Sequence, residues 1–235
     1  MVFILGCEIP EHAINDKNWL FYHDFKNSNH SWQTIYTLLD EPNKSIEKIN
    51  CWQSWQGKFA CTSFVPIRDG EVILNSPWWL DNNHAPPGAG YLNLLFYNYI
   101  DTIFSGNKKS LNLEDRTLYL KLRSSNLDLK QSKIFFWFQT KAINGKYINF
   151  VYTKVPIHLD EKMKTLEIKF TSNASDWICL GSNERRKDTY DCIDLKDAIS
   201  DVNIDFGLII FPTSNDPSPL MQPEGQIFIK AIGLY

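Results

Sequence analysis

The middle of the chain carries the pattern that most constrains its fold, an alternation of apolar and polar residues with a period of two. In Arg116–Arg123 three leucines occupy every second position, and Leu166–Phe170 alternates in the same way. Successive side chains of a β-strand point to opposite faces of a sheet, so this pattern predicts strands with one buried face. Lys133–Gln139 is apolar at every position between its ends, which is typical of a central strand covered on both faces.

Turn signals and β-rich segments extend the predicted sheet structure along the chain. Asp69-Gly70 predicts a hairpin between Phe59–Val65 and Glu71–Leu74, and Asn144-Gly145 predicts a tight turn before a returning strand at Lys146–Tyr152. Segments rich in β-branched and aromatic residues predict the remaining strands at 19–25, 31–39 (alternatively a helical turn), 90–100, 204–211 and 226–234.

Helix signals are rare in the sequence. Asp194 can cap a short helix over Leu195–Val202, in which four apolar residues fall on one face. The crossover helices of a parallel α/β fold are missing, and with them the nucleotide sites of such folds. The 235 residues contain no repeat, linker or low-complexity segment. We therefore predict a single all-β domain over residues 1–235, an antiparallel β-sandwich with one short helix.

Charge and hydropathy exclude several classes of partner. The net charge is −3, which does not suit a general nucleic-acid binder, and no apolar run is long enough for a membrane span. The segment Met1–Cys7 is too short for a signal peptide and has no basic start. Ile4–Cys7 resembles the end of a lipoprotein signal, but the charged and apolar stretches that precede such a site are missing. We expect the protein to stay where it is made, in the cytoplasm by default.

The five cysteines are an odd number and contain no C-x-x-C pair, so a zinc ribbon or thioredoxin motif is absent. We expect reduced and mostly buried thiols. The alternative is that Cys51 with Cys61, and Cys179 with Cys192, each close a short loop by a disulfide.

The segment Ser76–Tyr91 combines two adjacent tryptophans, a run of short polar side chains, and prolines and glycines that form a rigid loop. Aromatic faces stack on the C–H face of a sugar ring, while carboxylate, amide and imidazole groups bond its hydroxyls. The predicted ligand-binding residues of this loop are Trp78, Trp79, Asp81, Asn82, Asn83 and His84. The competing interpretation is a structural crossover, with one tryptophan in the core and the other at an edge.

Two further segments offer binding chemistry. Trp52 and Trp55 stand three residues apart beside two glutamines, and a turn could present both as a sugar platform or cap the core with them. The basic triplet Arg185–Lys187 suits a carboxylate or phosphate, or a solvated surface loop. No cofactor is predicted, although Asp81 and its neighbours leave a Ca²⁺ site open.

Several stretches resemble the galactose-binding-like jelly roll, a group that includes carbohydrate-binding modules, discoidin domains and the laminin IV type domain. The resemblance covers roughly residues 18–235 and is carried by Leu20–Phe25, Ser76–Trp79, Leu118–Arg123, Ile134–Gln139 and Gly225–Ile232. It implies ligand binding, usually to sugars and without catalysis.

The sequence contains no catalytic signature such as G-x-S-x-G. We therefore predict a non-catalytic, lectin-like module that binds a glycan or another polyhydroxylated ligand. The alternatives are a structural or adhesion domain with a protein partner, and a hydrolase acting on glycans or esters, which needs two carboxylates or a nucleophile and a base in one cleft.

Overall fold

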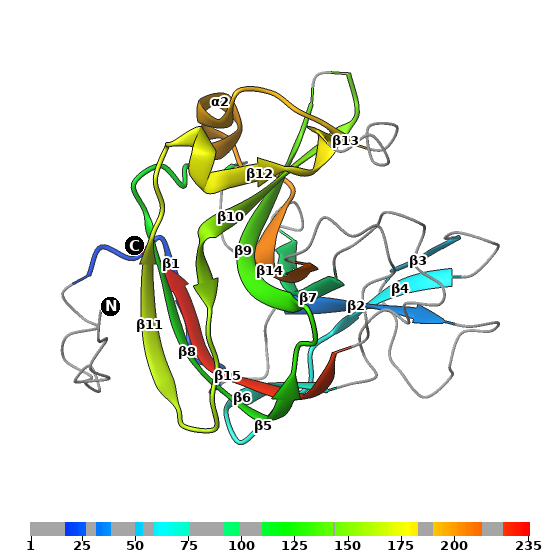
Figure 1. Ribbon diagram of the computed structural model, residues 1–235, viewed down its shortest axis with the longest axis vertical. Coiled ribbons are helices and arrows are strands. Elements are labelled where there is room, and N and C mark those ends of the chain that lie inside the picture. The colour runs from blue at the N-terminus through cyan, green and yellow to red at the C-terminus, as the bar shows by residue number, and fades with distance from the viewer. Residues whose placement is uncertain are drawn as a thin grey trace.

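The computed structural model describes residues 17–26, 32–38, 50–53, 59–75, 92–98, 110–142, 144–182, 190–212 and 223–235. In this part of the chain two β-sheets pack face to face, as Figure 1 shows. All strand pairs in the two sheets are antiparallel except one, the short parallel pairing of β13 with β10. The predicted all-β sandwich is confirmed, whereas its jelly-roll connectivity stays a prediction.

The smaller sheet contains six strands in the order β11-β8-β15-β6-β5, with β1 paired to β15. Their bounds are β1 Phe21–His23, β5 Ile67–Arg68, β6 Glu71–Asn75, β8 Thr117–Asp128, β11 Lys164–Lys169 and β15 Glu224–Leu234.

The larger sheet contains nine strands in the order β12-β10-β9-β14-β7-β2-β4-β3, with β13 paired to β10. Their bounds are β2 Trp32–Leu38, β3 Asn50–Gln53, β4 Phe59–Phe64, β7 Leu92–Asn98, β9 Ser132–Lys141, β10 Tyr147–Ile157, β12 Trp177–Cys179, β13 Tyr190–Asp191 and β14 Asp205–Pro212.

The core lies between the two sheets and contains the apolar side chains that alternate with polar ones in the sequence. The three leucines of β8 point inward and are almost fully buried, and they meet the aromatic side chains of Phe136, Phe138 and Phe170 in one apolar cluster. Large apolar side chains buried in this way each contribute roughly 1.5–3 kcal/mol to folding. The period-two pattern of the sequence therefore corresponds to the inner face of the smaller sheet.

The predicted hairpin at Asp69-Gly70 is correct in its turn and wrong in one of its strands. Asp69 and Gly70 have φ angles of 53° and 73°, as in a two-residue type I′ turn, and Arg68 pairs with Glu71. However, β4 belongs to the larger sheet. Val65 N still donates to Trp32 O in that sheet at 3.2 Å, whereas Pro66 O accepts from Ile73 N at 3.0 Å. The chain therefore changes sheets at Val65-Pro66, and only the two residues of β5 complete the hairpin.

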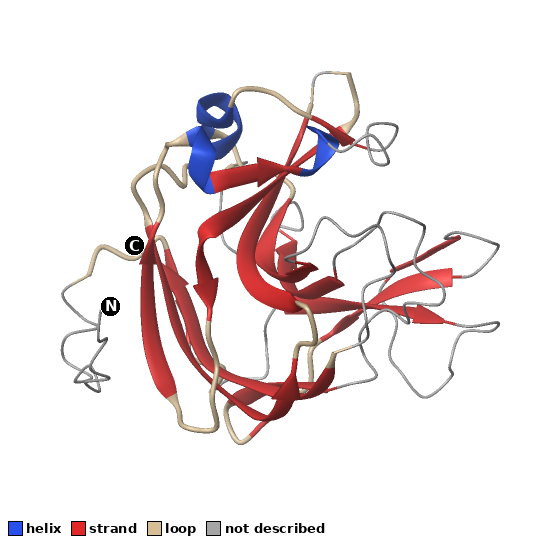
Figure 2. Ribbon diagram, in the orientation of Figure 1, coloured by secondary structure: helices blue, strands red, loops and turns tan. Residues whose placement is uncertain are grey.

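The predicted helix forms as α2 (Leu195–Ser200), at one end of the sandwich (Figure 2). Asp194 caps it, because its side chain accepts a hydrogen bond from Lys196 N. The helix ends before Val202, which instead forms an isolated β-bridge with Leu111. Two 3₁₀ turns, η3 (Ala174–Asp176) and η4 (Leu180–Ser182), flank β12.

The expectation of reduced thiols is wrong for Cys179 and Cys192, which form a disulfide with a Cα–Cα distance of 6.1 Å. The two cysteines meet because β12 and β13 both pair with β10. Cys179 lies opposite Phe150 of β10, and Asp191, the residue before Cys192, lies opposite Ile148 of the same strand. Cys51 and Cys61 are opposite each other in the register of β3 and β4. The side chains of these two cysteines, and Cys7, lie outside the described part of the chain.

Replacing both cysteines, C179S with C192S, is expected to lower the free energy of unfolding by about 3 kcal/mol, because the disulfide restricts a short loop in the unfolded chain. Urea unfolding followed by tryptophan fluorescence measures this difference. A thiol reductant should produce a similar loss in the wild-type protein and none in the double variant. Equal stability of the oxidised wild type and the double variant would contradict the role assigned to the disulfide.

Candidate functional site

The binding residues predicted from the sequence fall largely outside the described part of the chain. This holds for Trp78, Trp79, Asp81, Asn82, Asn83 and His84, for Trp55, and for the basic triplet Arg185–Lys187. Trp52 lies in β3, but its side chain is also outside the described part. The two loop sites and the Ca²⁺ alternative therefore stay predictions.

A different cluster of binding chemistry lies on the outer face of the larger sheet, across β10, β9 and β14. On β9, Phe136 and Phe138 point into the core between the sheets, so their neighbours Phe135 and Trp137 point to the other face. These two aromatic side chains form a second apolar cluster with Val151 and Leu180, among others. The larger sheet is thus buried on both sides at this position.

A row of polar side chains crosses the same face next to Trp137. In the strand register, Gln139 of β9 lies opposite Asn149 of β10 on one side and Asp205 of β14 on the other. Gln139 Nε2 donates a hydrogen bond to Asn149 Oδ1 at 3.0 Å. Adjacent strands are separated by about 4.8 Å, so two amides and one carboxylate stand side by side at neighbouring positions.

Two donors in this cluster have no acceptor among the described residues. They are Trp137 Nε1 and Asn149 Nδ2, on side chains that are only 4% and 2% exposed. A buried donor without a partner costs roughly 1–3 kcal/mol, and such groups are uncommon in native proteins. Asn149 belongs to the Gln139–Asn149 amide pair, and Trp137 lies two residues before Gln139 on the same face, so the cluster is suited to an incoming group that accepts hydrogen bonds.

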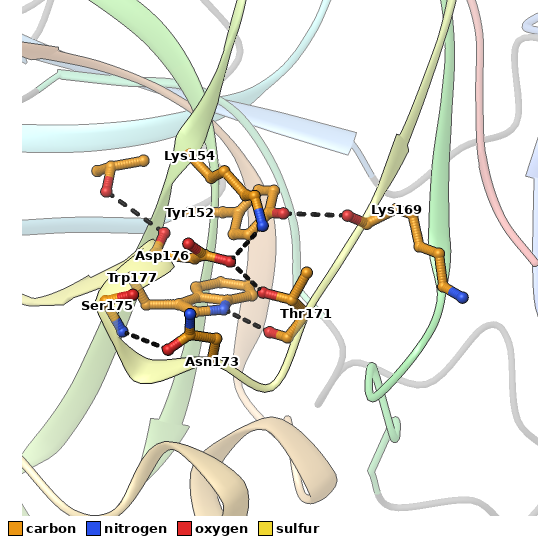
Figure 3. Close-up of polar contacts among 9 residues, drawn as sticks. Tyr152, Lys154, Lys169, Thr171, Asn173, Ser175, Asp176 and Trp177 are labelled. Carbon is orange, nitrogen blue, oxygen red and sulfur yellow. Dashed lines mark hydrogen bonds and ion pairs between the residues drawn. The ribbon is translucent and has the colours of Figure 1, made fainter.

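A second polar cluster, shown in Figure 3, fastens the segment after β11 to β10. Asp176 accepts hydrogen bonds from Lys154 Nζ at 2.8 Å and from Thr171 Oγ1 at 2.5 Å. Trp177 Nε1 donates to Thr171 O at 2.8 Å, and Tyr152 OH donates to Lys169 O at 3.0 Å. The polar groups of this cluster, which we call the Asp176 clasp, bind one another and therefore hold structure rather than await a ligand.

The electrostatics of the clasp agree with its structural role. The hydrogen bond from the Lys154 ammonium, with a second one from Thr171, holds the pKa of the Asp176 carboxyl below its usual value. Burial raises the pKa of the Tyr152 phenol, and the hydrogen bond with Thr171 opposes that rise. Asp176 thus stays ionised and occupied by its partners.

A third cluster covers the outer face of the smaller sheet with aromatic rings and the side chain of Lys17. The ammonium of Lys17 lies 3.9 Å from the ring centroid of Tyr235 and bonds to Glu167. Trp19 contacts Tyr235 edge to face and lies over Gly233, where a Cβ atom would come within 2.6 Å of the indole. This aromatic cage is filled by the lysine of the chain itself.

The sequence contained part of the signal for the Trp137 cluster. The two-sided apolar pattern of β9 was visible, and Gln139 ends it two residues after Trp137, on the same face. The row with Asn149 and Asp205 was missed because it depends on the register of three strands that are far apart in the sequence.

Comparison with protein-family models, with curated proteins and with solved structures found no match to this chain. In the part that the structure describes, no group of three or more His, Cys, Asp and Glu side chains is placed to hold a metal ion. No described helix has the length and apolar character needed to cross a bilayer.

The contribution of the Asp176 clasp to the free energy of unfolding should depend on pH, because it depends on the charge of Asp176. Because the folded-state pKa of Asp176 lies below the unfolded value of about 3.9, its contribution is complete above about pH 5 and is lost as the pH falls through the folded-state pKa. Asp176→Asn should therefore lower the free energy of unfolding at pH 7, and the difference from wild type should shrink towards pH 2. Urea unfolding across this range measures it.

Asp69→Asn is a suitable control for that measurement. Asp69 is exposed and adopts a positive φ in the type I′ turn, which asparagine also accepts readily. Its stability at pH 7 should match that of the wild type. A constant difference between wild type and Asp176→Asn from pH 7 to pH 2 would show that the charge of Asp176 does not contribute.

Proposed function

We propose that this protein is a non-catalytic carbohydrate-binding module of the galactose-binding-like type, and that the Trp137 cluster on the outer face of the larger sheet takes part in binding. The observation that carries the proposal is the pair of buried donors, Trp137 Nε1 and Asn149 Nδ2, without acceptors among the described residues. Asn149 is in register with Gln139, which is in turn in register with Asp205, and Trp137 lies two residues before Gln139 on the same face of β9.

The chemistry of the cluster fits a hydroxyl-rich ligand. A sugar hydroxyl both donates and accepts a hydrogen bond, so it satisfies an amide or indole N–H and a carboxylate oxygen at the same time. Gln139 and Asp205 are partly exposed, so both residues reach the surface at which the proposed ligand would lie. In this proposal the tryptophans supply the stacking faces, and the short polar side chains of the loop bond the sugar hydroxyls. The tryptophans are Trp52, Trp55, Trp78 and Trp79, and the polar residues are Asp81, Asn82, Asn83 and His84.

A second candidate function is binding of a protein partner. Three large hydrophobic residues near the Cys179–Cys192 disulfide are well exposed: Tyr147 at 44%, Ile178 at 40% and Ile193 at 42%. Ile178 and Ile193 adjoin the two cysteines in the sequence, and Tyr147 is in register with β13. Ile178 lies on β12, which ends the strand order of the larger sheet. Exposed apolar groups near a sheet edge favour contact with another protein.

Trp137→Phe tests the carbohydrate proposal. The variant keeps an aromatic ring and removes the N–H that has no described partner, but it also removes atoms of the five-membered ring from a packed cluster, so a moderate loss of stability is expected. Its affinity for a glycan found on an array should fall about tenfold, as expected for one lost hydrogen bond of roughly 1.4 kcal/mol. Calorimetric titration measures the affinity, and urea unfolding measures the stability.

Trp177→Phe is the matched control, because its Nε1 donates to Thr171 O inside the clasp. This variant should lose stability and keep its glycan affinity. Trp79→Ala and Trp52→Ala, titrated in parallel, show whether the loops contribute to the same binding. If no glycan on the array binds the wild type, or if Trp137→Phe binds as well as the wild type, the proposed face is wrong.

Ile178→Lys tests the second candidate. If the apolar group beside the disulfide binds another protein, this substitution should abolish any self-association detected by light scattering or any co-purified partner, and leave glycan affinity unchanged. A wild-type protein that is monomeric and without partner under the same conditions would argue against this candidate.

A further inference from the structure

The segment between β11 and β12 ends in an exposed tip that carries a sequence motif not used by the proposed function. Residues 172–175 are all exposed, whereas Phe170 and Trp177 on either side are buried. The tip reads Asn173-Ala174-Ser175, which is the Asn-x-Ser acceptor motif for N-linked glycans with a residue other than proline in the middle.

The local geometry leaves the acceptor atom accessible. Asn173 Oδ1 accepts a hydrogen bond from Ser175 N at 3.2 Å, so the carbonyl side of the amide is turned into the loop. No residue in the described part of the chain accepts a hydrogen bond from Asn173 Nδ2. An amide that becomes glycosylated keeps its Oδ1, so this hydrogen bond survives the modification.

The hydrogen bonds of the Asp176 clasp hold the two ends of the tip together. Thr171 and Asp176 lie on either side of the tip, and Thr171 Oγ1 donates a hydrogen bond to the Asp176 carboxylate. Trp177, the residue after Asp176, donates from Nε1 to Thr171 O (Figure 3). A glycan on Asn173 would therefore extend from a loop whose two ends are fixed. It would displace no side chain of the core, because none of residues 172–175 belongs to it.

The disulfide of the adjoining segment points to the compartment in which this modification takes place. Cys179 lies six positions after Asn173 in the sequence and is bonded to Cys192. Stable disulfides form in exported proteins and are rare in reducing compartments. Transfer of N-linked glycans occurs on surface loops of secreted proteins, so one route of maturation accounts for both features.

We propose that Asn173 is the acceptor of an N-linked glycan. Its Nδ2 attacks the anomeric carbon of an oligosaccharide whose leaving group is a lipid-linked pyrophosphate. The C–N bond forms as the bond from the anomeric carbon to the phosphate oxygen breaks, the pyrophosphate leaves with the electron pair, and the amide nitrogen loses one proton. This inference is independent of the proposed carbohydrate-binding function.

Mass spectrometry of the protein purified from its source tests the proposal on one tryptic species. Trypsin releases Phe170–Arg185, which contains Asn173 and Cys179, and Asp188–Lys196, which contains Cys192. Without reduction we expect the two peptides to be linked, with a glycan on Asn173. Treatment with an N-glycanase should remove the glycan and leave aspartate at this position. Linked peptides with unmodified Asn173, or separate peptides with free thiols, would overturn the proposal.

Variants of the full chain, exported through a eukaryotic secretory pathway, test whether the motif directs the modification. Asn173→Gln and Ser175→Ala should lose the glycan, whereas Ser175→Thr keeps the motif and should retain it. The disulfide-linked peptides report that each variant has folded. The motifs at Asn29 and Asn43, which lie outside the described residues, are mapped separately by their own peptides. Modification of Asn173 in the Ser175→Ala variant would overturn the assignment to this motif.

Discussion

The burial of β9 on both faces is the constraint on which the rest of the larger sheet depends. One face of this strand supplies Phe136 and Phe138 to the core between the sheets, and the other supplies Phe135 and Trp137 to the outer cluster. Its backbone is paired along its length with β10 and β14. A strand held in this way cannot slip by one residue without exchanging the two apolar sets, so the register of its neighbours is well determined.

That register positions both the polar row and the edge of the sheet. Because β10 is aligned on β9, Asn149 meets Gln139, and the far side of β10 remains open for β12 and β13. These short strands cannot be held by their few backbone hydrogen bonds alone. The Cys179–Cys192 disulfide supplies an additional constraint at the last residue of β12, and the Asp176 clasp supplies another where this strand begins.

The sequence predicted the elements that depend on residues close together in the chain. It did not predict the features that depend on pairing between segments far apart in the chain. Strand periodicity, the Asp69-Gly70 turn and the Asp194 cap depend on residues close together in the chain, and all three form as expected. The placement of β4 in the larger sheet does not follow from the turn, because it depends on its pairing with β2. The disulfide and the Gln139–Asn149 contact likewise depend on which strands become neighbours, which spacing alone does not determine.

The distribution of charge indicates the kind of ligand that the described surface can take. Several of its carboxylates are already paired with cations of the same chain, in the ion pairs of Lys17 with Glu167, Arg123 with Glu71, Lys130 with Asp128, Lys154 with Asp176, and Lys164 with Asp160. Each of these five carboxylates has a cationic partner, which reduces the negative charge that it presents to a ligand.

The Trp137 cluster has the opposite character. Its donors are the neutral N–H groups of an indole and of amides, and its only ionisable member in the row is Asp205. A carboxylate among neutral donors repels an anionic ligand. A hydroxyl group accepts from the N–H donors and donates to the carboxylate, so it matches these groups well. The proposal of an uncharged, hydroxyl-rich ligand, rather than a phosphate or a carboxylate, therefore rests on the chemistry of the row and not on the fold that carries it.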